Sequence, residues 1–562
     1  MLRKSGCIII LLSIILVGFS KESFCGPFGY YPTHSEIDSV LDDLSQRYPN
    51  IFKRDILGTK TIENRDIFYV KISNSPDEDN KKPEALITGA QHSCEVIGPA
   101  CVRLDMNHLC ENYDTDPEVK WLVDNRQIYF VPIYNIDGYL YIESSGNKNW
   151  RKNRRRNDDG SYGVDPNRNY PYKWGYDDIN SSSNPSAMNY RGKSPVSEPE
   201  TEAMIDFIHD HTFRTWQNHH SDRDVLVIPF GYDYTVSLGQ DSIIYYTMCQ
   251  EQENEYGRFK KWGPSYIAYD GFALNGGTED WSWSDSATYR VYCIITELGS
   301  AMWESDAAAK VTAEKMLGAD MYMIKCAGFY PVLKSIEIKD DAAGCNSDGI
   351  LNPGETVKLL AEIENKSVVD TTQNVKGQLS SSYQHVDMKD AEADYSSIKQ
   401  LETFENSTLD PFEFKCGSQA QEGDWAKFDL KITWTMNSVN FEKTLPCSTR
   451  VGSYVGVIHQ YQIPGLEGGI RIVQSPYNRL ISIKLVIPSE HLVNCINDHL
   501  EIGIYNAGGR ELRRIDHSVN EQSNVIDWDM TDNSGINIPE GVYFIRVSFN
   551  GFNATEKFII LQ

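Results

Sequence analysis

The chain has 562 residues and carries 53 basic against 79 acidic side chains, a formal net charge of −26. This length predicts two to four domains. Its dense basic block, Arg151 to Arg156, is short, and so acidic a chain repels phosphate backbones, which excludes wholesale nucleic-acid binding.

The N-terminus has the pattern of a secretory signal peptide. Arg3 and Lys4 precede an apolar run from Ile8 to Phe19, and small and polar residues follow. Twelve apolar residues are too few to span a bilayer. We therefore expect residues 1–25 to be a signal peptide and the protein to be secreted or displayed on the cell surface.

Residues 26–330 alternate strand and helix patterns. Apolar runs such as 84–89, 126–135 and 291–299 predict strands, and amphipathic segments such as 35–48 and 306–326 predict helices. This alternation predicts an α/β domain with a mixed, mostly parallel sheet flanked by helices.

After residue 330 the pattern changes to short alternating runs separated by Asn, Gly, Ser and Pro. We expect two all-β sandwich domains, at 331–459 and 460–562. Within them Cys416 and Cys447 are candidates for a disulfide in an oxidising compartment.

The segment "CNSDGILNPGE" gathers oxygen ligands around a glycine turn. Asn346, Asp348 and Glu355 make it a candidate calcium site, and an ordinary turn rich in Asn, Asp and Gly is the alternative.

Chemistry-bearing residues follow three predicted strands of the first domain. His92 and Glu95 come after the strand in "ALITGAQHSCE", and a hydrolytic zinc site needs a third ligand and an open position for water. The adjacent residues His219 and His220 both offer that ligand. Glu297 ends the apolar run "YCIITE", where an isolated carboxylate is costly to bury and a zinc-water partner would explain it.

The ordered motifs H-x-x-E, N-W-R-K-N-R, V-D-P-N-R-N, H-S before P-F-G-Y, E-D-W and T-E-L-G resemble the zinc carboxypeptidase family that includes carboxypeptidases A, B and T. The resemblance covers about 27 to 327. It implies one zinc ion and a peptidase that removes C-terminal residues from peptides or proteins.

The resemblance also implies individual roles. His92, Glu95 and His220 match the zinc ligands, His220 rather than His219 because it precedes Pro229 by nine residues. Glu297 matches the general base. Arg151 matches the arginine that stabilises the oxyanion, and the adjacent pair Asn167 and Arg168 matches the group that binds the substrate's free carboxylate.

Three positions depart from the family pattern. Phe272 stands where the family usually has Tyr, so its hydroxyl is missing or is supplied by Tyr269 or Tyr266. Cys94 replaces an arginine. Glu279 takes the pocket-floor position that holds Asp in the carboxypeptidase B type, which favours C-terminal Lys or Arg. The alternative is an apolar pocket made by Leu274 and Ile295, with Glu279 turned away.

Residues 465–562 resemble the FlgD-like and type IX secretion sorting domains that end many secreted bacterial proteins, which implies secretion machinery as a partner. Two other functions stay open. One is a cell-wall peptide amidase on the same fold. The other is a surface binding protein whose catalytic domain has lost activity. The sequence leaves the oligomeric state open.

Overall fold

The computed structural model describes residues 28–452, with short gaps at 286–289, 343–344, 369–371 and 407–409, and in the tail the strands and scattered turn residues between 469 and 560. The signal peptide predicted for residues 1–25 lies outside the described residues. Among the helices that are described, none is both long and apolar enough to cross a membrane.

The chain divides into two compact units. The first is Met1–Glu78 with Glu84–Ile324, and the second is Asp79–Pro83 with Lys325–Gln562. The sequence-based boundary at 330 falls just after this division. The further split of the second unit into two domains stays a prediction.

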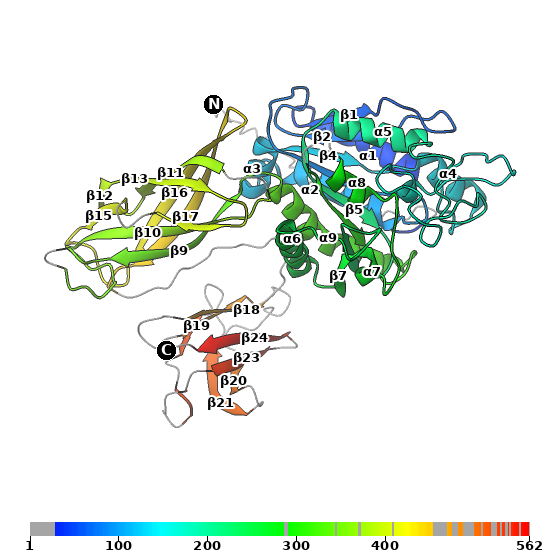
Figure 1. The fold of residues 1–562 in the computed structure, drawn as a ribbon. Coiled ribbons are helices and arrows are strands. Elements are labelled where there is room, and N and C mark those ends of the chain that lie inside the picture. The colour runs from blue at the N-terminus through cyan, green and yellow to red at the C-terminus, as the bar shows by residue number, and fades with distance from the viewer. Residues whose placement is uncertain are drawn as a thin grey trace, which may run out of the picture. The chain divides into compact units, whose positions relative to one another are not determined.

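Eight strands form one sheet in the first unit, in the order β1-β2-β4-β3-β5-β8-β6-β7 (Figure 1). The central strands β4, β3, β5 and β8 are parallel to one another. The pairs β1–β2, β2–β4 and β6–β8 are antiparallel, and β7 lies parallel to β6. The predicted mixed, mostly parallel α/β sheet is confirmed. The strands are β1 (Phe52–Ile56), β2 (Phe68–Ile72), β3 (Glu84–Thr88), β4 (Gln127–Val131), β5 (Phe213–His220), β6 (Val225–Ile228), β7 (Lys261–Pro264) and β8 (Tyr292–Glu297).

Local sequence signals explain where the helices begin. Thr33 and Glu36 form a reciprocal capping box on the first helix, and Asp116 caps the third, which has proline at its first position. The helices are α1 (His34–Arg47), α2 (Ile97–Asn112), α3 (Pro117–Asn125), α4 (Ile136–Ser145), α5 (Pro199–His209), α6 (Asp241–Tyr256), α7 (Ser265–Ala268), α8 (Thr278–Ser284) and α9 (Asp306–Cys326), with a 3-10 turn at Pro166–Arg168.

Helices lie on both faces of the sheet, and the alternating side chains of β5 show which helices lie on which face. Thr215 and Gln217 point to one face, where they hydrogen-bond α9 and α6. Asn218 points to the other face and donates to Thr278 of α8. Because neighbours in a strand point to opposite faces, His219 and His220 must also separate.

The β-rich unit contains a sandwich of two antiparallel sheets. One has the order β12-β15-β10-β14 with β9 beside β10, and the other has the order β13-β11-β16-β17. Phe414 and Phe428 meet between them, with ring centroids 4.9 Å apart. The strands are β9 (Pro331–Lys339), β10 (Thr356–Asn365), β11 (Thr372–Ser381), β12 (Val386–Asp390), β13 (Glu392–Ile398), β14 (Thr403–Glu405), β15 (Phe412–Cys416), β16 (Trp425–Met436) and β17 (Val439–Arg450).

The tail forms two further antiparallel sheets, β18-β19-β22 and β21-β20-β23-β24. Its strands are β18 (Gly469–Gln474), β19 (Ile481–Val486), β20 (His499–Asn506), β21 (Glu511–Ser518), β22 (Val525–Trp528), β23 (Gly541–Phe549) and β24 (Phe552–Ile560).

The predicted disulfide between Cys416 and Cys447 is not formed. Both cysteines are free and buried, in strands β15 and β17 of different sheets of the sandwich.

The predicted calcium site gains no support. The side chain of Asn346 donates to Asp348, while the Glu355 carboxylate accepts from the backbone amides of Asn346 and Asn352. Asp340, which the sequence reading did not include, accepts two more backbone amides of this turn. Hydrogen bonds within the turn thus occupy the oxygens proposed as ligands.

Candidate active site

The site lies at the carboxyl ends of three adjacent parallel strands. β5 ends at His220 and β8 ends at Glu297, and these two residues are register partners. β3 ends at Thr88 and continues into the loop that carries His92 and Glu95 ahead of α2. Open α/β sheets bind ligands at this edge, because the loops there diverge from the strand ends.

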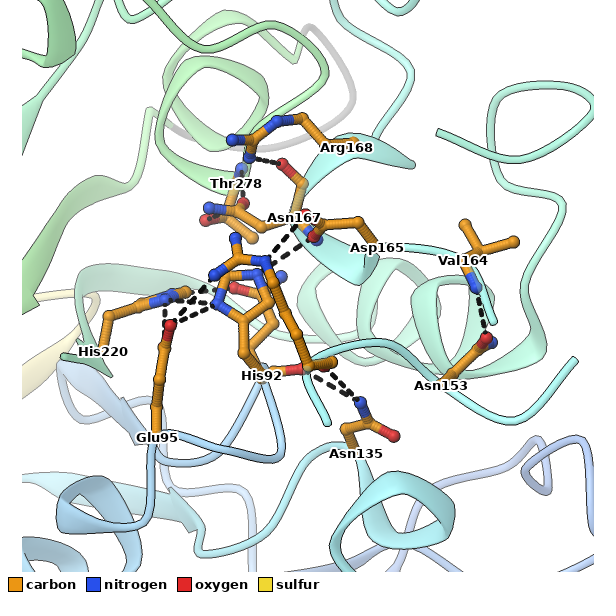
Figure 2. A network of polar contacts seen from close by, with 12 residues as sticks. His92, Glu95, Asn135, Asn153, Val164, Asp165, Asn167, Arg168, His220 and Thr278 are labelled. Carbon is orange, nitrogen blue, oxygen red and sulfur yellow. Dashed lines mark hydrogen bonds and ion pairs between the residues drawn. The ribbon is translucent and has the colours of Figure 1, made fainter. Parts of the chain in front are cut away.

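His92, Glu95 and His220 converge on one point, and each is nearly fully buried (Figure 2). The His92 Nδ1 lies 2.9 Å from Glu95 Oε1, the His220 Nδ1 lies 2.8 Å from Glu95 Oε2, and the two Nδ1 atoms are 3.0 Å apart. Two imidazole nitrogens and a carboxylate are a ligand set that zinc takes in hydrolases.

On the imidazole rings of His92 and His220, the nitrogens that face away from Glu95 make hydrogen bonds that indicate a cation between the rings. The His92 Nε2 lies 3.0 Å from Asp165 Oδ1, and the His220 Nε2 lies 3.0 Å from the Gln91 side-chain oxygen. Both partners are acceptors, so each Nε2 carries the proton and each neutral Nδ1 turns a lone pair inward. Burial lowers the pKa of His220 to about 4, which keeps that ring neutral. The residues present therefore fit a zinc ion.

Asp165 joins the metal ligands to Arg151. The Arg151 guanidinium donates to Asp165 over 3.0 Å and to Glu95 over 3.1 Å. Burial alone would raise the pKa of Asp165, but the charges of Arg151 and Arg168 and the hydrogen bond from His92 outweigh it and hold that pKa well below its usual range. Arg151 keeps a side chain 22% exposed, so it can also face a bound substrate.

Glu297 is the carboxylate available for proton transfer. Burial, reinforced by the charge of Glu95, raises the pKa of Glu297 to about 8. Tyr269 is half-buried next to it and donates its hydroxyl to Glu297 Oε1 over 2.5 Å. A buried carboxylate with a raised pKa at a strand end suits a general base.

Asn167 and Arg168 form the 3-10 turn at the side of the site, and Asp165 caps that turn. The Asn167 side-chain oxygen accepts from the backbone amide of Thr278, which ties the turn to α8 (Figure 2). Arg168 is 7% exposed and donates to the backbone oxygens of Asn180 and Asn167. These hydrogen bonds thus hold the guanidinium group of Arg168 in place at the side of the site.

Glu279 is fully buried, and the structure places both its oxygens without a hydrogen-bond donor among the described residues. Its carboxylate lies against the backbone of Gly231 and Gly277, where a Cβ would come within 2.6 Å of an oxygen. Burial raises the pKa of Glu279 to about 7, although Arg168 opposes the shift. Leu274 is buried against the same Gly231, whereas Ile295 is buried in a core with Val225 and Val227.

Two residues that replace family residues are not placed for chemistry. The Phe272 side chain is 62% exposed, and of the two tyrosines weighed as substitutes it is Tyr269 that reaches Glu297. Tyr266 is 40% exposed and stacks on Tyr234. Cys94 is buried, and burial raises the pKa of its thiol to about 12, so it is not a reactive thiolate.

Sequence reasoning gave no role to Asp165 or Gln91. Asp165 stands inside the quoted motif V-D-P-N-R-N, so that motif was its signal. Gln91 directly precedes His92, and no pattern singled it out. His219, the competing ligand candidate, points away from this site, with its Nδ1 2.8 Å from the hydroxyl of Thr296.

Comparisons with known proteins agree with this geometry. Residues 37–306 match the family model described as zinc carboxypeptidase. Carboxypeptidase A2 of Mus musculus is 30% identical over 267 residues, which are 47% of this chain and 61% of that protein. Carboxypeptidase B of Rattus norvegicus is 28% identical over 264 residues, 46% of this chain and 61% of that protein.

The chain thus spans about three fifths of the length of these curated relatives. Among solved structures, bovine thrombin-activatable fibrinolysis inhibitor aligns at 23% identity and a TM-score of 0.46, over 53% of this chain and 97% of that one. The murein-tripeptide amidase of Escherichia coli O157 aligns at 17% identity and a TM-score of 0.31, over 49% of this chain and 94% of that one.

The family model covers the strand ends that supply His92, Glu95, His220 and Glu297. The ligand set within that segment is the one on which the structure converges. The match to the zinc carboxypeptidase family model thus covers the segment, residues 37–306, that supplies this ligand set.

Proposed function

We propose that the chain is a zinc-dependent carboxypeptidase that hydrolyses the last peptide bond of peptides and proteins. The observation that carries the proposal is the buried His92–Glu95–His220 set with Glu297 at the neighbouring strand end and Arg168 at the side. A binding protein that had lost catalysis would have no use for a complete ligand set next to a base of raised pKa.

The residues divide the reaction among them. A zinc ion held by His92, Glu95 and His220 supplies Lewis acidity and makes water nucleophilic near neutral pH. Glu297 accepts the proton of the attacking water and returns it to the leaving amine. Arg151 donates to the oxygen on which negative charge develops.

Arg168 and Asn167 select the end of the substrate. A guanidinium is planar and permanently charged, so it binds a free carboxylate through two parallel hydrogen bonds. A substrate that presents this carboxylate next to the scissile bond gains that interaction, whereas an internal peptide bond does not. The enzyme therefore acts as an exopeptidase.

A pair of peptides tests this function. One peptide ends in a free carboxylate and its twin ends in an amide, and mass spectrometry follows loss of the last residue. We expect the amide to react at least about 100-fold more slowly, the order that loss of a charged hydrogen-bond pair brings. The variant Arg168→Lys keeps the positive charge but loses the planar guanidinium group. The ratio of the rates on the carboxylate peptide and the amide peptide should therefore decrease. Equal rates on both twins would contradict the proposal.

We also propose that Glu279 gives a preference for C-terminal Lys or Arg. Its carboxylate is buried without a donor from the described residues, and a cationic side chain would supply one. A panel ending in Lys, Arg, Phe, Leu and Glu tests this. Faster release of Lys and Arg supports the preference, and faster release of Phe or Leu contradicts it while leaving the reaction intact.

We further propose export of the chain to the bacterial surface or medium, with residues 465–562 as the sorting segment. The N-terminal apolar run and the all-β tail motifs support this. Cell fractionation of the full chain and of a chain ending at residue 459 tests it. Loss of export in the shorter chain is the expected result, and unchanged export would contradict the role of the tail.

A further inference from the structure

A second group of metal-type ligands is buried on the opposite face of β5 from the catalytic set. It consists of Asp105 from α2, His219 from β5 and Asp320 from α9. One ligand atom from each lies within 4.8 Å of the others, and all three residues are 0% exposed. The α2 helix packs directly on this strand, since a Cβ on Gly98 would lie 3.1 Å from the Cβ of His219.

The atoms that face each other in this group lack other partners. The His219 Nε2 lies 3.1 Å from Asp320 Oδ2, while its Nδ1 is engaged by Thr296. Within the described part of the chain, no hydrogen bond from outside the group reaches that Nε2 or any of the four carboxylate oxygens of Asp105 and Asp320, although the two carboxyl groups contact each other. Buried polar atoms are nearly always paired, so five such atoms that face only one another call for a missing partner.

The electrostatics of Asp105, His219 and Asp320 also indicate a bound cation. Burial raises the pKa of Asp105 and Asp320 well above the usual range, and the charge of Asp320 raises that of Asp105 further. Two adjacent buried carboxyl groups beside an imidazole form an environment that a divalent cation would neutralise.

We propose that Asp105, His219 and Asp320 bind a second divalent metal ion, separate from the catalytic zinc. Imidazole and carboxylate ligands suit zinc, which is the first ion to test.

The second ion would be structural. It would join α2, β5 and α9 in a fully buried position, where substrate has no access. The catalytic ligands lie at the ends of the same elements, because α2 begins two residues after Glu95 and His220 follows His219 directly. Holding these elements together would fix the position of the catalytic ligands.

Metal counting on the full-length chain tests the proposal. The protein is purified, dialysed against metal-free buffer and analysed by inductively coupled plasma mass spectrometry, before and after reconstitution with zinc alone. We expect two ions per wild-type chain, and one ion in each of Asp105→Asn, Asp320→Asn and His220→Ala. The two Asn variants keep the size of the side chain and should fold, which circular dichroism checks.

Glu200→Gln is the matched control. Glu200 is another buried carboxylate of the first unit, but it accepts from Ile62 and Asn153 instead of facing metal-type ligands. This variant should keep two ions. One ion per wild-type chain would overturn the proposal, as would two ions in Asp320→Asn or no ion in His220→Ala. The count does not depend on peptidase activity, so it stands or falls separately from the proposed function.

Discussion

Two buried ligand groups lie back to back on the last two residues of β5, and they differ in their surroundings. The His220 group has outer partners, because Asp165, Gln91 and Arg151 hydrogen-bond its ligands. The His219 group has Thr296 as its one outer partner among the described residues, and it is closed on every side. Hydrogen-bond partners around the ligands and the partly exposed Arg151 are features of a group that can act on a substrate. A fully buried group, such as that of His219, can only stabilise the structure.

The most direct test of this difference between the two groups is to replace His220 and His219 in turn. His220→Ala should lose at least about 1,000-fold in kcat/KM, since the zinc that drives the reaction loses a ligand. His219→Ala should keep most of its activity per folded molecule and lose stability instead. Peptide hydrolysis and thermal unfolding of both variants measure this. If His219→Ala loses the activity and His220→Ala keeps it, the assignment of the two residues is wrong.

Removing the base while keeping the ligands separates chemistry from metal binding. Glu297→Gln should lower kcat by about 10²- to 10⁴-fold, the usual contribution of a general base, with the metal content unchanged. Asp270→Asn is the control, because that carboxylate directly follows Tyr269, the partner of Glu297, but pairs with Lys261 at the surface. A Glu297→Gln enzyme that retains wild-type kcat would remove Glu297 from the mechanism.

The residues that hydrogen-bond the zinc ligands can be tested by a substitution with a smaller expected effect. Asp165→Asn should weaken zinc affinity by about 10- to 100-fold, because the amide no longer holds His92 and Arg151 by charge. Competition with a chromogenic chelator measures the affinity. An affinity equal to that of the wild type would mean that the outer partners do not distinguish the two groups.

Glu279 is a third buried carboxylate without a donor, and its test is a pH profile. Its pKa, raised to about 7, means that the carboxyl is mostly neutral below pH 7 and mostly charged above it. The preference for Lys over Leu should therefore grow as pH rises from 6 to 8, by up to about tenfold. Glu279→Gln should show a flat ratio, and a wild-type ratio that does not change with pH would contradict the role of Glu279.

Much of the catalytic group could be predicted from the sequence because its residues follow strand ends in short motifs. His92 and Glu95 follow one apolar run and Glu297 ends another, and parallel strands bring their carboxyl ends to one edge. The spacing to Pro229 favoured His220 over His219, and the alternation of side chains along β5 gives the physical reason why the two separate.

The second group could not be predicted in this way. Asp105 and Asp320 lie inside helices, where a single acidic residue carries no signal of its own, and their meeting depends on how α2 and α9 pack on the sheet. The predicted pairing of Cys416 with Cys447 was wrong for a related reason, because the sequence does not say whether packing brings the two side chains together. Tertiary packing decides both cases.

One measurement addresses the central claim most directly: release of the C-terminal residue from a peptide ending in Lys, by the full-length chain, with and without a zinc chelator. The account predicts that release occurs one residue at a time, stops with the chelator and returns when zinc is restored. A folded, zinc-loaded chain that releases no residue, or that releases it equally well in the chelator, would contradict the account.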